Sequence, residues 1–350
     1  MSTPAADQTP LHAFETLTPD IVLDALASIG LTGDGRLMAL SSYENRVYQI
    51  HLEADPASTA STAGEAGDVV VAKFYRPERW TDAQILEEHS FANELMAAEV
   101  PVVGALTLQG HTLHHFNGFA FSVSPRRGGR RPELDDADVL AWIGRFLARI
   151  HTVGAAKPFA HRPALDLQTF GYASRAVLLT NDYLPLDMAS RWLKAFEQAM
   201  QVVADVFKGV GAIKTIRLHG DCHPGNILWT PEGAPSAGPH FVDLDDARSG
   251  AAVQDLWMLL SGDRAQCLRQ LGALVDGYEE FRDFDRRELA LIEPLRTLRL
   301  IHYSAWLAQR WHDPIFPINF PWFGSSDYWK GQVDMLEEQT EAMQSPPLLA

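Results

Sequence analysis

The chain has 350 residues, of which 46% are hydrophobic and 21% charged, and its formal net charge is -16. This composition supplies enough apolar material for one large domain or for two packed lobes. The net negative charge argues against non-specific binding to nucleic acid or to an anionic membrane, because both are polyanions.

The sequence carries no sign of a membrane span, a leader peptide or a disulfide framework. No apolar run reaches the roughly 18 residues that a spanning helix needs. The first ten residues lack the basic and apolar parts of a signal peptide. Two cysteines, Cys222 and Cys267, are too few for a framework, and no Cys or His spacing indicates zinc. We therefore expect a soluble protein in a reducing compartment.

The first third of the chain is typical of strands around one main helix. Thr18-Pro19 is an N-cap followed by proline at the first helical position, and Gly30 ends that helix. The stretch 54–67 contains only small and polar residues, so we expect a long mobile loop there. Segments rich in Val, Ile, Tyr and Phe predict strands, and a proline-terminated segment predicts the main helix. The strands are expected at 45–51, 68–75 and 118–124, and the helix at 82–98.

The rest of the chain is expected to be mostly helical. Apolar residues recur at helical spacing in 135–151 and in 189–208, while a hairpin is expected around the loop 231–239. We therefore predict an α+β fold with two lobes. Residues 1–124 would form an antiparallel β-sheet lobe with one main helix, and residues 125–350 a larger, mostly helical lobe.

One stretch carries the most specific chemical pattern in the chain. The segment Arg217-Leu-His-Gly-Asp-Cys-His-Pro-Gly-Asn226 places Asp221 and Asn226 five positions apart in a Pro-Gly turn. Asp243 follows on a predicted strand just beyond the hairpin, from which it can face the turn. Phosphoryl transfer needs one carboxylate to orient and deprotonate the incoming hydroxyl. It also needs a second carboxylate and a neutral oxygen to hold Mg²⁺ on the phosphates.

We therefore assign Asp221 as the catalytic base, and Asn226 and Asp243 as magnesium ligands. Magnesium keeps several waters, so two protein oxygens are a sufficient contribution. The alternative is that Asp221 and Asn226 only cap backbone groups in the turn, as Asx residues often do. The complete set, with Asp243, favours the catalytic interpretation.

Lys73 lies in the apolar strand segment 68–75. A lysine there is costly unless it finds a counter-charge. Glu88, on the following predicted helix, can provide it, and in kinases such a pair holds the α- and β-phosphates of ATP. Glu87 and Glu94 lie on the same helix and remain alternatives. A lysine on an edge strand that points into water would also explain the residue.

These motifs resemble a known family. His-Gly-Asp-x-His-x-x-Asn followed by a strand-borne Asp is similar to the signature of the aminoglycoside phosphotransferase and choline kinase superfamily, relatives of the protein kinases. Four longer segments resemble, more narrowly, the bacterial stress response kinases, which are described as serine/threonine protein kinases. These segments are 42–48, 73–80, 241–248 and 254–260.

The resemblance implies a two-lobed, protein-kinase-like fold, ATP as donor, Mg²⁺ as cofactor and Ser/Thr hydroxyls on protein as acceptors. It also implies a cytoplasmic location. Ser42 would contact ATP, Asp221 would be catalytic, and Asn226 and Asp243 would bind magnesium. We expect a monomer whose partners are ATP and a protein substrate, with no nucleic acid and no membrane.

The sequence departs from ordinary protein kinases in three places. The nucleotide loop, residues 40–46, has no glycine, so the hydroxyls of Ser41 and Ser42 are expected to replace backbone amides at the phosphates. A plain surface turn is the alternative. The catalytic turn reads His219-Gly-Asp221, where a protein kinase has Arg in the middle. Only 11 residues separate Asp243 from Asp255, which leaves no room for a long activation segment.

Residues around the turn have simpler expected roles. His219 and His223 are expected to be hydrogen-bonding scaffold, and Asp255 to hold the turn through backbone amides. Cys222 is expected to be a buried thiol rather than a redox switch. The aromatic stretch 306–329 is expected to be a loop packed by its own rings against the helical lobe, with a partner surface as the alternative.

Two other functions compete with a protein kinase. A small-molecule hydroxyl kinase, of the aminoglycoside, choline or homoserine kinase class, is supported by the superfamily signature. Asp245, Asp246 and the net negative charge would suit a cationic acceptor. A pseudokinase would lack the base, a metal ligand or the lysine, and all of these are present.

Overall fold

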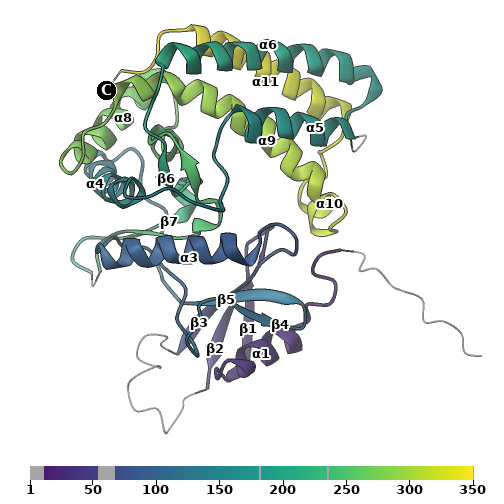
Figure 1. Ribbon diagram of the computed structural model, residues 1–350, viewed down its shortest axis with the longest axis vertical. Helices are drawn as coiled ribbons and strands as arrows, with labels where there is room; N and C mark the ends of the chain where they lie inside the picture. Colours follow the sequence, from purple (N-terminus) through teal and green to yellow (C-terminus); the bar gives the residue numbers. More distant parts are fainter. Residues whose placement is uncertain (1–11, 54–67, 181–182, 235, 350) are drawn as a thin grey trace, which may run out of the picture. The chain divides into compact units, whose positions relative to one another are not determined.

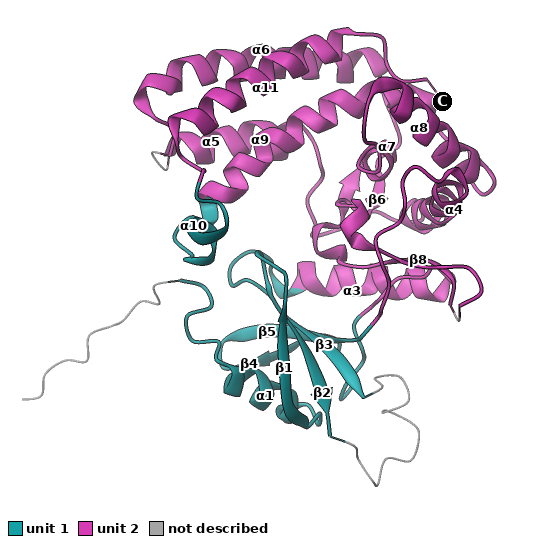
Figure 2. Cartoon of the chain, turned by 180° about the vertical axis from the view of Figure 1, so that it is seen from behind, with its two compact units in different colours: residues 1–82, 105–126, 309–321 teal, residues 83–104, 127–308, 322–350 magenta. Residues whose placement is uncertain are grey.

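The structure is a computed structural model that describes residues 12–53, 68–180, 183–234 and 236–349 (Figure 1). The predicted loop 54–67 lies outside these residues. The chain forms two compact units, each made of segments that are separate in the sequence (Figure 2). Unit 1 contains residues 1–82, 105–126 and 309–321, and unit 2 contains 83–104, 127–308 and 322–350. The predicted lobe boundary between residues 124 and 125 stays a prediction.

Unit 1 contains an antiparallel five-stranded sheet with the order β1-β2-β3-β5-β4. The three predicted strands are confirmed, and the prediction missed two. The missed β1 starts with Gly and Asp, which are depleted in strands, and β4 has only three residues. The strands are β1 (Gly33–Leu40), β2 (Arg46–Leu52), β3 (Val69–Phe74), β4 (His114–Phe116) and β5 (Phe119–Pro125).

Helix α1 (Pro19–Ser28) packs with this sheet to make the core of unit 1. The Thr18 side chain accepts a hydrogen bond from the Ile21 N–H, and Gly30 follows the helix at φ +87°, as the sequence predicts. Along β3 every second residue is buried, which puts Val70, Ala72 and Phe74 into this core. Lys73 therefore lies on the opposite face of the sheet.

The remainder of the chain is mostly helical, with two short two-stranded sheets. The predicted helices at 82–98, 135–151 and 189–208 are confirmed, and so is the hairpin around 231–239. The helices are α3 (Asp82–Ala97), α4 (Ala137–Gly154), α5 (Ala173–Thr180), α6 (Leu186–Val210), α7 (Val253–Trp257), α8 (Arg264–Glu279), α9 (Ile292–Arg310), α10 (Ile315–Asn319) and α11 (Ser326–Gln344). The strands are β6 (Ile216–Leu218), which pairs with β9 (Arg248–Gly250), and β7 (Ile227–Thr230), which pairs with β8 (Gly238–Phe241). Among the helices of the described residues, none is both long and apolar enough to cross a membrane.

Helices α4 and α8 of unit 2 approach each other closely because glycines face the contact. A Cβ on Gly144 would lie 2.1 Å from the Leu274 carbonyl oxygen, and one on Gly277 would lie 2.0 Å from the Ala141 carbonyl oxygen. Real Cβ atoms do not tolerate such distances, so larger residues would force the helices apart. This contact fixes α4, which carries His151 into the site described next.

Candidate active site

The catalytic turn, residues 219–226, connects β6 to β7 in unit 2. Gly220 has φ +85°, and a Cβ there would lie 2.2 Å from the Asp246 carbonyl oxygen. Only glycine fits this conformation and this close approach. The turn is thereby held against residues 244–246, which form a single 3-10 turn directly after Asp243.

Asp255, on α7, holds the turn in place by accepting hydrogen bonds from its backbone amides. Its carboxylate accepts from the His219 N–H and the Gly220 N–H, each at 2.9 Å, and its Oδ2 lies 3.0 Å from Nε2 of His151. The Asp255 and His151 side chains are both fully buried. Burial raises the pKa of Asp255, but hydrogen bonds from His151 and the backbone outweigh it and keep that pKa below its ordinary value. The predicted role of Asp255 is confirmed, whereas the role of His151 was missed.

The structure brings Asp221, Asn226 and Asp243 together. Nδ2 of Asn226 donates to the Asp221 carbonyl oxygen at 2.9 Å, and the Asn226 carbonyl accepts from the Val242 N–H at 3.0 Å. The β7–β8 hairpin thus places Asp243 beside Asn226. His219 supports the same arrangement, because its Nε2 lies 3.0 Å from the Val242 carbonyl oxygen. This is the scaffold role that the sequence predicts for His219.

Asp243 departs from the prediction in its backbone. Strand β8 ends at Phe241, so Asp243 is not on the strand but two residues beyond it. Its φ of 61° and ψ of 65° are left-handed, which costs a non-glycine residue about 1–3 kcal/mol. Such conformations cluster at functional sites, where the surrounding contacts enforce them. Here the turn exposes the Asp243 side chain.

The donors present fit a magnesium ion. The amide nitrogen of Asn226 faces the Asp221 carbonyl, which leaves the amide oxygen for a ligand role. Asp243 adds an exposed carboxylate. Both are hard oxygen donors of the kind that magnesium accepts, in the small number that leaves it several waters. Within the described ranges, no cluster of three or more His, Cys, Asp or Glu residues offers a metal site of another kind.

Arg299, which sequence analysis did not single out, places a positive charge at the proposed base Asp221. Nη1 of Arg299, on α9, lies 2.7 Å from Oδ1 of Asp221, and Nε2 of His223 lies 3.5 Å from Oδ2. The Asp221 side chain is 20% exposed and the Arg299 side chain 39%, so solvent still reaches the pair. His223 also caps the turn, because its Nδ1 accepts from the Gly225 N–H at 2.9 Å. Arg299 is 78 positions from Asp221 in the sequence, and no local pattern connects them.

The predicted nucleotide residues of unit 1 lie at the sheet. Ser41 and Ser42 follow β1 directly, with Ser41 exposed and Ser42 half-buried. Lys73 lies on β3, between β2 and β5, opposite Val47 and Ser122. The edge-strand interpretation of Lys73 is therefore wrong, because β3 is an inner strand. Nζ of Lys73 lies 5.2 Å from the centre of the Tyr75 ring.

The three acids of α3 have distinct partners within unit 2. Oε2 of Glu88 lies 3.0 Å from Nη2 of Arg162, whose side chain is fully buried. Arg162 also donates to the Asp245 and Ala247 carbonyl oxygens, so it ties α3 to the segment after Asp243. Lys73 and Glu88 belong to different units, and their pairing stays a prediction.

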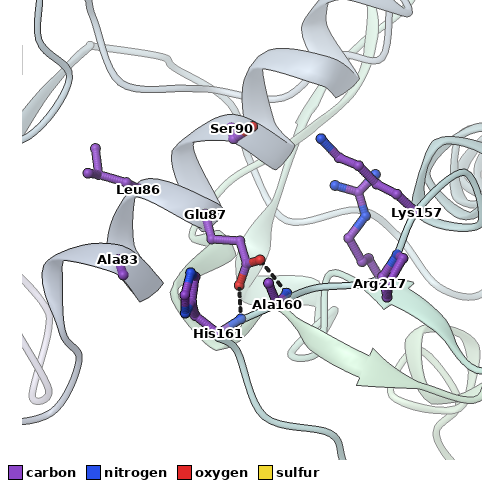
Figure 3. Close-up of a pocket in the computed structure, with 9 residues that line it drawn as sticks. Ala83, Leu86, Glu87, Ser90, Lys157, Ala160, His161 and Arg217 are labelled. Carbon is purple, nitrogen blue, oxygen red and sulfur yellow. Dashed lines mark hydrogen bonds between the residues drawn. The ribbon is translucent and has the colours of Figure 1, made fainter.

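The other two acids line or flank a pocket of about 380 Å³. Figure 3 shows the Glu87 carboxylate reaching the backbone N–H groups of Ala160 and His161. Glu94 pairs instead with Arg217 and Lys157, both at 2.8 Å. The pocket lies between α3, the loop 157–161 and β6, and Asp221, Asn226 and Asp243 are not among its lining residues. The charged side chains of Glu87, Glu94, Arg217 and Lys157 therefore connect α3 to the loop 157–161 and to β6.

Cys222 follows the proposed base directly and is fully buried. Burial raises the pKa of its thiol well above the ordinary value, and Asp255 and Asp221 raise it further. The reactive thiolate is therefore disfavoured, which supports the expected role as a buried thiol.

The aromatic stretch 306–329 is partly helical and partly turns rather than one loop, but its rings pack on one another as predicted, for example Trp322 on Tyr328 at 5.1 Å. It comprises the end of α9, all of α10 and the start of α11. Its last residues pack in unit 2, where the Trp329 ring meets the Trp192 ring of α6 at 6.0 Å and Trp329 Nε1 donates to the Tyr183 carbonyl. Residues 309–321 belong to unit 1 (Figure 2).

Comparison with known proteins supplies the family evidence. A family model described as phosphotransferase enzyme family matches residues 37–292. Stress response kinase A of Escherichia coli (strain K12) is 45% identical over 335 residues, which cover 96% of each chain. Serine/threonine protein kinase RdoA of Salmonella typhimurium is 44% identical, again over 96% of each chain.

Solved structures share the fold at low sequence identity. An amicoumacin kinase solved with AMP-PNP and Ca²⁺ has a TM-score of 0.67 at 16% identity, over 94% of each chain. A microcompartment-associated aminopropanol kinase also has a TM-score of 0.67, at 14% identity, over 93% of this chain and 97% of the other. The predicted α+β kinase fold, with its antiparallel sheet and helical remainder, is confirmed.

Proposed function

This chain belongs to the phosphotransferase enzyme family and is an ATP-dependent kinase, and from that premise we propose that it phosphorylates serine and threonine hydroxyls on proteins. The observation that carries the proposal is the 44–45% identity, over almost the whole chain, to relatives named stress response kinase A and serine/threonine protein kinase RdoA. By the same likeness we place its activity in the stress response.

Asp221 is the proposed base. An acceptor hydroxyl oriented by its carboxylate gives up its proton to Asp221, while its oxygen forms the new bond to the γ-phosphorus of ATP. The bond from that phosphorus to the β–γ bridging oxygen breaks, and ADP leaves with the bond's electron pair. Asp255, His151 and Gly220 hold Asp221 in place for this step, because they fix the backbone of the turn directly before it.

Asn226 and Asp243 are the proposed magnesium ligands, and magnesium, when bound, neutralises charge on the β- and γ-phosphates. The fixed amide of Asn226 and the exposed carboxylate of Asp243 support this assignment. Asp243→Ala should weaken Mg·ATP binding sharply while leaving metal-free ATP binding unchanged. A normal magnesium titration of that variant would refute the ligand role.

Nucleotide contacts are assigned to unit 1 and to α3. Ser41 and Ser42 offer hydroxyls to the phosphates, and Lys73 offers an ammonium that Glu88 orients. Their support is the position of Lys73 on an inner strand and of both serines directly after β1. We further propose a monomer in the cytoplasm, where ATP is available.

The charges near Asp221 favour a protein acceptor over a cationic small molecule. The acids that would attract a cation are engaged: Asp246 pairs with Arg248 at 2.7 Å, and Asp245 is buried. Arg299 instead adds a positive charge directly at the proposed base. A polycationic acceptor would be repelled there, whereas a neutral or acidic peptide would not.

The test measures which acceptor receives labelled γ-phosphate. Purified protein is incubated with Mg·ATP and either a set of Ser/Thr peptides, of acidic, neutral and basic sequence, or a pool of amino alcohols, sugars and aminoglycosides. Asp221→Asn is run beside the wild type in each mixture. We expect Asp221-dependent label on peptide Ser or Thr. Label on small molecules alone would move the chain to the small-molecule kinases and contradict the proposal.

A further inference from the structure

The part of the nucleotide loop between β1 and β2, residues 41–45, is held in shape chiefly by Arg76 of unit 1. Nε of Arg76 donates to the Glu44 carbonyl at 2.9 Å, and Nη2 donates to the Tyr43 carbonyl at 3.2 Å. The Arg76 backbone N–H donates to Oδ1 of Asn45 at 3.0 Å. Three consecutive residues of a glycine-free loop are thus fixed by one residue that lies two positions beyond β3.

Residues 309–321 hold this arginine and the loop from the far end of the chain. Asp313 accepts from Nη2 of Arg76 at 2.8 Å and pairs with Arg46 at 3.2 Å. Nε of Arg310 lies 2.6 Å from Oε2 of Glu44. The Asp313 side chain is only 3% exposed and the Arg76 side chain 10%. Removing one partner of a buried ion pair strongly destabilises the folded protein, because the other charge is left uncompensated.

Aromatic rings complete the contact. The Arg76 guanidinium lies 5.5 Å from the Phe316 ring centre, and Phe316 is fully buried. The Tyr43 ring meets the Phe320 ring edge-on at 5.1 Å. Figure 2 shows α10 in the colour of unit 1, although α11 and nearly all of α9 have the colour of unit 2. The segment is therefore part of the unit that carries the nucleotide loop.

We infer that residues 309–321 are a brace that positions Ser41 and Ser42 for ATP, with Asp313 and Arg76 as its positioning residues. The inference rests on the proposed nucleotide role of the two serines. A glycine-rich loop gains its phosphate contacts by backbone freedom. A loop without glycine needs its hydroxyls fixed beforehand, so that ATP binding does not have to order them.

The test replaces Asp313 by Asn, which keeps the shape and removes the charge. Asp34→Asn is the matched control, since Asp34 also pairs with an arginine of unit 1, Arg36, but at the surface, where Arg36 is 69% exposed. We measure KM for ATP, kcat, and hydrogen exchange of the amides in 41–45 without nucleotide. We expect Asp313→Asn to raise KM about tenfold, which corresponds to about 1.4 kcal/mol, with kcat within about twofold and faster loop exchange. Asp34→Asn should change none of these.

Two further variants keep the inference falsifiable if Asp313→Asn folds poorly. Asp313→Glu retains the charge and should recover most of the ATP affinity. Arg76→Lys retains charge but not the guanidinium fork, so it should lose the loop contacts and raise KM as Asp313→Asn does. Hydrogen exchange and KM that stay at wild-type values in folded variants would overturn the inference. So would faster exchange with unchanged KM, because the loop would then be held without serving ATP. A wild-type protein without phosphotransfer would count against the proposed function instead, and the exchange comparison would still decide whether Asp313 holds the loop.

Discussion

The nucleotide loop of unit 1 and the catalytic turn of unit 2 are both short and irregular, yet they are fixed by different means. The catalytic turn is held by one buried carboxylate, Asp255, which accepts hydrogen bonds from two backbone N–H groups. It is also held by Gly220, which packs closely against the Asp246 carbonyl oxygen. The loop 41–45 is held by charged side chains, chiefly Arg76 and Asp313.

The two regions should therefore respond differently to the loss of their supporting side chains. Backbone amides pointing at a buried carboxylate have no other acceptor, so the catalytic turn should lose its fold when the carboxylate is lost. The Arg76–Asp313 pair is also buried, but it lies outside the apolar core of unit 1, so the loop should lose its position before unit 1 loses its fold.

Asp255→Ala should destabilise the protein by about 3–5 kcal/mol, because it leaves His151 and the N–H groups of His219 and Gly220 without their buried acceptor. Asp255→Asn keeps one oxygen and should cost less, about 1–3 kcal/mol. Chemical denaturation followed by circular dichroism measures both. If Asp255→Ala cost no more than Asp313→Asn, the proposed contrast between the two regions would be wrong.

Glu288 allows a pH-dependent test of the support of α7, the helix that carries Asp255. Its carboxylate accepts from the N–H of Val253, the first residue of the helix that carries Asp255. Burial raises the pKa of Glu288 to about 7. Between its unfolded pKa, near 4.5, and about 7, the folded state binds more protons than the unfolded state, so the free energy of unfolding falls as pH rises through this window.

Glu288→Gln removes this ionisation and keeps an oxygen for the Val253 N–H. Relative to the wild type it should gain stability from pH 5 to pH 8, by at most about 3 kcal/mol, and the gain should level off above pH 8. Melting temperatures of both proteins across this range measure it. A stability difference that is equal at pH 5 and pH 8 would show that Glu288 is not held protonated.

The pH dependence of stability expected from Asp255 has the opposite sign. Its pKa is lowered in the folded state, so its contribution to the free energy of unfolding is present at neutral pH and is lost as pH falls below about 4.

Arg299→Gln should have the smallest effect, on acceptor preference rather than on stability. Loss of the charge beside Asp221 should raise activity toward basic relative to acidic peptides by about two- to fivefold, as expected for a half-exposed pair worth up to about 1 kcal/mol. Arg296→Gln is the control on the same helix, because Arg296 pairs with Glu293 at 3.0 Å. An unchanged preference ratio in Arg299→Gln would remove Arg299 from acceptor selection.

The sequence predicted the residues of the catalytic turn because they lie close together along the chain. Asp221 and Asn226 share one turn, and Asp243 follows after a single hairpin, so residue type and spacing were sufficient to predict that these residues come together. Arg299 and His151 reach the same turn from separate helices, and side chains brought together by tertiary packing leave no local pattern. Asp243 was placed on a strand because the apolar residues before it continue the pattern to Val242, whereas hydrogen bonding of β8 ends at Phe241.

In unit 1, too, the contacts made between distant segments could not be predicted from local sequence patterns. The inner strands were predicted from their content of Val, Ile, Tyr and Phe, and α1 from its cap residues. Strand β1 was missed because Gly33 and Gly35 weaken the strand pattern. The nucleotide role of the loop 40–46 rests on the resemblance of its residues to the stress response kinases and stays a proposal. The support of this loop by Asp313, more than 260 positions away, follows from a segment that the sequence indicated only by its aromatic content.

The most direct test of the account compares turnover with ATP binding in Asp221→Asn. Because the base acts only on the acceptor hydroxyl, we predict that phosphotransfer falls by about 10²- to 10⁴-fold, while the dissociation constant for ATP stays within about threefold and the melting temperature is unchanged. Phosphotransfer at the wild-type rate in the folded variant would contradict the assignment of Asp221 and, with it, the catalytic reading of the turn.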